Sequence, residues 1–135
     1  MRLSRASAIA VFAITRLAES EPKEPRQGRD LAQELGVPAD SLLKVLQQLV
    51  RSGLLISSRG RSGGFRLSRP PEAISLLDIV EAVDGAIEGR LLSASDIRGM
   101  TNTKAGIELA FEETVRSVRG LLAKTSVRNL MNHAT

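Results

Sequence analysis

The sequence predicts a mainly helical protein with one small β-hairpin, and three patterns lead to that class. Apolar residues recur at helical spacing between Pro38 and Ser52, with polar residues on the opposite side. Two short apolar runs flank the glycine-rich segment 59–64, which is typical of a hairpin. A coiled-coil-like stripe follows in residues 103–122. Together they predict a winged helix-turn-helix with a long C-terminal helix.

The first part of the chain contains three predicted helices. Their ranges are Leu3–Ala18, Gly28–Leu35 and Pro38–Ser52. Pro22 and Pro25 remove backbone donors between the first two helices, so the mixed-charge segment Glu19–Gln27 is predicted to be a solvated loop. Gly36 suits the left-handed stop of the second helix. Pro38 suits the first position of the third helix, where its missing N–H is no loss.

The hairpin and further helices follow. The predicted elements are strands at Leu54–Ser58 and Phe65–Ser68, a helix between Ser75 and Gly85, an irregular connector at Ala86–Asn102, a long helix at Thr103–Leu122, and a short last helix with Val127, Leu130 and Met131 that packs back. Ser75 and Asp78 form a capping-box pattern, and Gly85 stops that helix. We interpret the acids Asp78, Glu81 and Asp84 as solvating charges and not as a metal or acid–base cluster.

An apolar stripe runs along the long helix at steps of three and four residues. It consists of Ile107, Phe111, Val115, Val118 and Leu122. A helix with such a stripe must bury it, either against its own domain or against a second copy. Pairing of two copies would give a twofold dimer. Phe12 lies off the apolar stripe of the first helix and is predicted to pack against another chain.

Basic residues are concentrated in the first half of the chain. Residues 1–70 hold twelve Arg or Lys against six Asp or Glu, whereas residues 71–135 hold seven against nine. Between Arg51 and Arg69 there are five arginines and no acid. Such a surface suits a polyanion, and an ordinary solvated surface is the alternative.

The polar side of the helix 38–52 and the hairpin tip carry groups that suit duplex DNA. The short donors, amides and cations of that helix are the types that meet base edges and phosphates in a major groove. Glycines at the tip permit a tight turn, and Arg59 and Arg61 suit a narrow, electronegative minor groove. A nucleotide-phosphate cradle is disfavoured, because the loop lacks the G-x-x-x-x-G-K-[ST] spacing and does not open a helix.

Other functions fit the sequence less well. The chain has no cysteine and no tyrosine, and its one histidine, His133, stands close to the end, so the usual nucleophiles and general bases of an enzyme are missing. A winged-helix module that docks on an acidic protein surface is the alternative to DNA binding, but it would not demand an acid-free stretch. No run of about 18 apolar residues is present, which excludes a membrane helix, and we expect a cytoplasmic protein.

These motifs together resemble the Rrf2 family of bacterial winged-helix transcription factors, which includes the iron–sulfur-cluster regulator and the nitric-oxide-sensing repressor. The resemblance covers nearly the whole chain, and the segments that carry it are Met1–Ser4, Asp30–Ala32, Leu54–Leu67 and Arg69–Gly85. The Arg-Gly…Gly-Gly-aromatic run and the proline-containing link after it are the most specific part. This chain has Ile9 where the family usually has a tyrosine.

The resemblance implies a homodimer joined through the long C-terminal helices, with the helix 38–52 in a major groove and the wing in the adjacent minor groove. The residues predicted to contact DNA are Ser41, Lys44, Gln48, Arg51, Arg59, Gly60, Arg61, Gly63, Gly64 and Arg66. Cluster-binding members place three cysteines between the fourth and fifth helices, and Leu91–Ala105 contains none. We therefore predict no iron–sulfur cluster and no other cofactor.

The sequence thus predicts a sequence-specific DNA-binding regulator, a repressor, without catalytic activity. Residues 1–85 form the predicted DNA-binding domain, 86–102 the connector, and 103–135 the dimerisation helix and tail. Control by a small molecule, control by a partner protein and constitutive DNA binding all remain open.

Overall fold

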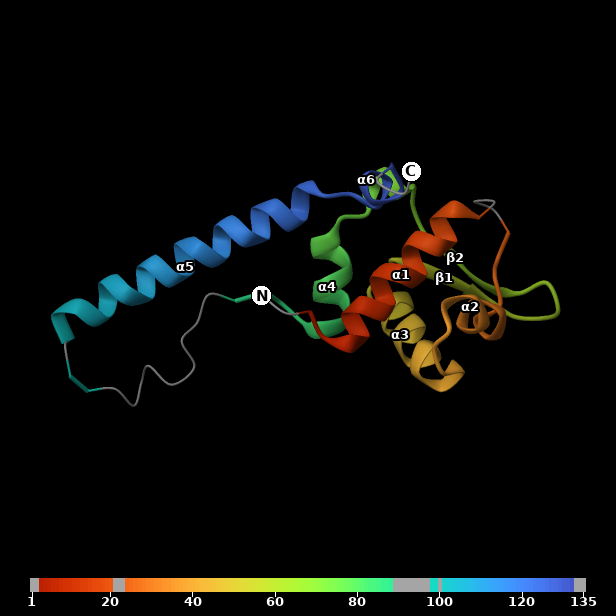
Figure 1. Cartoon of the computed structure of the whole chain (residues 1–135), viewed down its shortest axis with the longest axis horizontal. Coiled ribbons are helices and arrows are strands. Elements are labelled where there is room, and N and C mark those ends of the chain that lie inside the picture. Colours follow the sequence, from red (N-terminus) through yellow and green to blue (C-terminus); the bar gives the residue numbers. More distant parts are fainter. Residues whose placement is uncertain (1–2, 21–23, 89–97, 100, 133–135) are drawn as a thin grey trace.

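The computed structural model describes residues 3–20, 24–88, 98–99 and 101–132 and has the predicted class, mainly helical with one hairpin (Figure 1). Its elements are α1 Arg5–Glu19, α2 Gly28–Leu35, α3 Ala39–Arg51, β1 Leu55–Ser58, β2 Gly64–Leu67, the 3₁₀ turn η1 Pro71–Ala73, α4 Leu76–Asp84, α5 Thr101–Lys124 and α6 Val127–Asn132. Most of the predicted connector lies outside the described residues.

The predicted helices are confirmed, and where their ends differ from the prediction they do so by one or two residues. Ser4 caps α1 by accepting a hydrogen bond from the Ser7 amide, so the helix begins at Arg5. Pro38 has an extended conformation and is the N-cap of α3, whereas the sequence pattern predicts it at the first helical position. Ser75 and Asp78 form the predicted capping box of α4.

The hairpin is antiparallel, and its register pairs Leu55 with Leu67 and Ser58 with Gly64. A third segment joins it: Arg26 and Phe65 form an antiparallel bridge, with amide-to-carbonyl distances of 2.9 and 2.8 Å. The prediction of a wholly solvated loop at 19–27 is therefore wrong for Arg26. Backbone pairing with a strand 39 residues later leaves no local sequence pattern.

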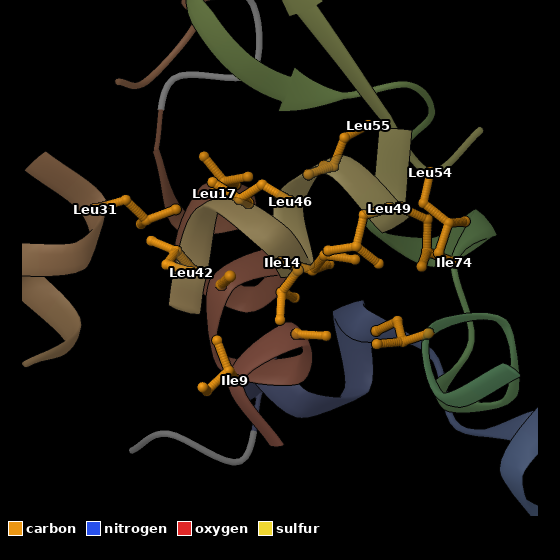
Figure 2. Close-up of a cluster of buried hydrophobic side chains, with 14 of the residues drawn as sticks. Ile9, Ile14, Leu17, Leu31, Leu42, Leu46, Leu49, Leu54, Leu55 and Ile74 are labelled. Carbon is orange, nitrogen blue, oxygen red and sulfur yellow. The ribbon is translucent and has the colours of Figure 1, made fainter. Parts of the chain in front are cut away.

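One hydrophobic core unites the helices with the base of the hairpin (Figure 2). Leu42, Leu46 and Leu49 of α3 are fully buried, and Ile14 of α1 lies among them. Ile9 is also buried, so this position packs without an aromatic ring. This packing holds α3 by its apolar side and leaves its polar side at the surface.

The acids of α4 are not free solvating charges, and that interpretation is wrong. Asp84 accepts hydrogen bonds of 2.6 Å from the hydroxyls of Ser4 and Ser7, which ties α4 to the start of α1. Glu81 accepts from the Ile87 amide at 2.7 Å and pairs with Arg119 of α5. Asp78 belongs to the capping box. Each carboxylate therefore has a structural partner.

The long helix α5 extends away from the rest of the molecule, on the side opposite the wing (Figure 1). After it the chain returns: the Val127 amide donates to the Ile74 carbonyl at 2.8 Å, and Val127 is fully buried in the core. The division into 1–85, 86–102 and 103–135 stays a prediction, but α6 packs on the same core as the winged helix. None of the helices in the described part of the chain has the length and hydropathy needed to cross a membrane.

Candidate nucleic-acid interface

The exposed side of α3 carries the predicted groove-facing residues. Lys44 and Arg51 are exposed, while Ser41 and Gln48 are partly exposed. Leu43, which the helical pattern grouped with the apolar arc, is 44% exposed and borders this side. The exposed groups are thus a hydroxyl, an amide and two cations, held on a helix whose other side is anchored in the core.

The wing tip places two arginines at the surface on a constrained turn. The Gly63 amide donates to the Gly60 carbonyl at 3.0 Å, and Gly60 has a φ of +100°. Arg59 and Arg61 are exposed on either side of Gly60. Arg66 follows on β2, opposite Ile56, and is partly exposed.

Two of the predicted contact residues have structural roles as well. Gly63 is buried, and a Cβ there would lie 2.8 Å from the Arg59 carbonyl oxygen. Gly64 has a φ of +139°, and a Cβ there would lie 2.9 Å from the Gln27 nitrogen and closer still to the Arg26 carbonyl. Both glycines are needed where backbone passes against backbone, so they shape the wing.

The wing is attached to the start of α2 by residues that sequence reasoning missed. The Gln27 side-chain amide donates to the Arg61 carbonyl at 3.1 Å, and Arg26 is paired with Phe65. The sequence contains one signal for this contact, the adjacent glycines Gly63 and Gly64, because glycine in a strand often marks the close approach of another backbone. These contacts fix the wing relative to the helix-turn-helix.

The interface cations are free of protein carboxylates. Within the described ranges, ion pairs are formed by Arg16, Arg26, Arg119 and Arg128. No ion pair within these ranges involves the cations that are predicted to contact DNA, which are Lys44, Arg51, Arg59, Arg61 and Arg66. Residues 41–71 contain no Asp or Glu, and in the described part of the chain Asp40 stands one helical turn before Lys44 without forming an ion pair with it.

A family model described as "Iron-dependent Transcriptional regulator", Rrf2, matches residues 3–133. The chain belongs to the Rrf2 family. Its members are transcriptional regulators, and this protein is a DNA-binding transcriptional regulator of that kind.

Relatives agree with the family assignment. A Mycobacterium tuberculosis protein named as a candidate HTH-type transcriptional regulator, MT1325, is 32% identical over 121 residues, which cover 87% of this chain and 75% of the relative. The HTH-type transcriptional regulator IscR of Vibrio cholerae is 31% identical over 88 residues, covering 65% of this chain and 51% of IscR. The chain thus matches only about half of the length of some relatives.

Solved structures of the family have the same fold. CymR, the global cysteine regulator of B. subtilis, superposes with a TM-score of 0.82 at 22% identity, covering 100% of this chain and 99% of CymR. T. potens IscR superposes with a TM-score of 0.75 at 21% identity, covering 100% and 89%. The winged helix and the long α5 are therefore the architecture of these Rrf2 proteins.

The family's description mentions iron, and this chain has no thiolate ligands with which to bind it. A thiolate-bound cluster requires cysteines, and the sequence has none. Within the described residues no group of three or more His, Asp or Glu side chains is arranged to hold a metal ion.

Proposed function

We propose that this Rrf2 protein is a homodimeric, sequence-specific repressor that acts in the cytoplasm without an iron–sulfur cluster and without catalytic activity. The observation that carries the proposal is the set of carboxylate-free cations on α3 and the wing. A row of unneutralised cations on a rigid helix and a hairpin tip suits the phosphates and grooves of duplex DNA.

The proposed contacts follow the two exposed elements. Ser41, Lys44, Gln48 and Arg51 would enter a major groove on α3, and Arg59, Arg61 and Arg66 would serve the wing in the adjacent minor groove. Gly60, Gly63 and Gly64 give the tip its shape and bring its backbone amides near the phosphates.

Dimerisation through α5 is supported by its exposed apolar side chains. Ile107 is 48% exposed, Phe111 39% and Leu121 68%, on a helix that stands away from the body. Burying such a stripe against a second copy would remove it from water and place two α3 helices on one duplex. The predicted seam also includes Val115, Val118 and Leu122, which are partly buried within the described chain, and Leu121 widens it.

The test is fluorescence anisotropy with DNA from upstream of the protein's own gene and with unrelated DNA, at several salt concentrations. Tight binding that prefers the upstream fragment and weakens steeply with salt is expected. Arg59→Ala should weaken specific binding by roughly 1–3 kcal/mol. Lys124→Ala, which removes a cation at the end of α5, is the matched control and should change it little. Salt-insensitive behaviour, or no binding at low salt, would instead favour a protein-docking module.

A further inference from the structure

A single carboxylate, Glu34 on α2, connects three segments of the molecule. Its Oε2 accepts from Arg16 Nε of α1 at 2.8 Å, and its Oε1 accepts from Arg26 Nη2. The other nitrogen of the Arg26 fork, Nη1, donates to the Ser20 hydroxyl at 2.8 Å. The Arg26 guanidinium is thus held by α2 and by the end of α1.

The same Arg26 forms part of the wing through its backbone. Its amide and carbonyl exchange both hydrogen bonds with Phe65 of β2, and Gly64 lies directly against its carbonyl. Gln27, the next residue, binds the carbonyl of Arg61 at the wing tip. Any displacement of Arg26 therefore moves the wing relative to α2 and α3.

We propose that Glu34 is a positioning residue for DNA recognition: by clamping Arg26 against Arg16 it fixes the angle between the wing and the helix-turn-helix. Glu34 would not touch DNA. This inference rests on the proposed DNA-binding function, because it says how two DNA-contacting elements are held in register.

The clamp is better placed than an ordinary surface ion pair. The Arg26 side chain is 24% exposed and that of Glu34 34% exposed, so water competes less for this pair than for an open one, whereas the Arg16 side chain is 46% exposed. Both oxygens of one carboxylate are used, and both cations come from other elements. The hydrogen bond from Arg16 and that from Arg26 lower the pKa of Glu34 although burial opposes this, so the carboxylate stays charged near neutral pH.

The first experiment measures the affinity of Glu34→Gln for the specific DNA. The substitution removes one negative charge per protomer, so long-range electrostatics alone predicts equal or tighter binding. A positioning role predicts weaker binding, by about three- to tenfold for a dimer with two clamps. Glu72→Gln is the matched control, because it removes the carboxylate of the exposed Glu72–Arg128 pair outside the clamp and should not weaken binding.

The second experiment asks whether Glu34 acts through the wing. In a protein that carries Arg59→Ala, Arg61→Ala and Arg66→Ala, the three cations assigned to the wing contact are gone, so adding Glu34→Gln should weaken binding much less than it does in the unaltered protein. Amide hydrogen exchange on the DNA-free protein gives an independent reading. Exchange of the Phe65 amide, bonded to Arg26, should accelerate in Glu34→Gln, while the Ser68 amide, bonded to the Leu54 carbonyl, should keep its protection.

The outcomes separate this inference from the function on which it rests. If the unaltered protein shows no salt-sensitive binding to DNA, both are overturned. If it binds but Glu34→Gln binds as well or better, only the clamp is overturned. An equal loss with and without the wing arginines, or equal acceleration of exchange at Phe65 and Ser68, would mean general destabilisation and would also overturn it.

Discussion

Replacing Gly64 by alanine probes the place where the wing touches the linker. The new methyl group would occupy the space of the Arg26 carbonyl, and the alanine would have to adopt a φ of +139°. Arg26 must then move, which breaks its two hydrogen bonds with Phe65, or the alanine must remain strained and overlapped. Both routes lower the free energy of unfolding.

The expected loss of stability in Gly64→Ala follows from the costs of these two routes. Overpacking costs roughly 1–3 kcal/mol, and a backbone in a sparsely populated region costs roughly 1–3 kcal/mol. Breaking two backbone hydrogen bonds costs about 0.5–1.5 kcal/mol each. Because the chain takes the cheaper combination, we expect Gly64→Ala to lower the free energy of unfolding by roughly 2–4 kcal/mol. Gly60→Ala is the control: its φ is +100° but nothing lies within 4 Å, so only the backbone cost of roughly 1–2 kcal/mol applies.

Urea unfolding of the two variants and the unaltered protein, at one fixed protein concentration, measures the difference. Gly64→Ala should be the less stable variant, by about 1–2 kcal/mol at the middle of the two ranges, and its Phe65 amide should exchange faster. Equal destabilisation by the two substitutions would refute the argument that backbone contact with Arg26 requires a glycine at position 64.

Three further predictions concern other parts of the molecule. Val115→Glu should convert the dimer to monomers in sedimentation, because it places a charge in the α5 seam; a variant that still sediments as a dimer would move the interface elsewhere. Ser75→Ala should lower the free energy of unfolding by about 1 kcal/mol by removing the α4 cap, and Ser57→Ala, on an exposed strand position, should change it far less. Acid should destabilise the protein: burial raises the pKa of Asp84, but the hydrogen bonds from Ser4 and Ser7 outweigh it and lower that pKa. Stability from this ionised group is therefore complete above about pH 4–5 and lost as pH falls through the lowered pKa, so Asp84→Asn should flatten the acid limb of a stability–pH curve.

For the candidate site, as for the fold, local sequence patterns predict some features and leave others open. The α3 face and the arginine tip could be read from the sequence because helical periodicity and turn glycines are local signals. The linker strand, Glu34 and Asp84 could not, because their partners lie 8 to 80 residues away along the chain. Asp84, for example, reads as an exposed helix charge until α1 is packed beside it.

The sequence by itself therefore determined the elements, their order, the family resemblance and the absence of thiolate ligands, since each depends on residue type and spacing alone. Only the tertiary structure decided that Arg26 belongs to the wing, and that α5 extends from the core with Ile107, Phe111 and Leu121 exposed while Val115, Val118 and Leu122 are partly buried. The physical reason is that hydrogen bonding and burial between distant segments are set by how the elements pack, and packing is a property of the whole chain.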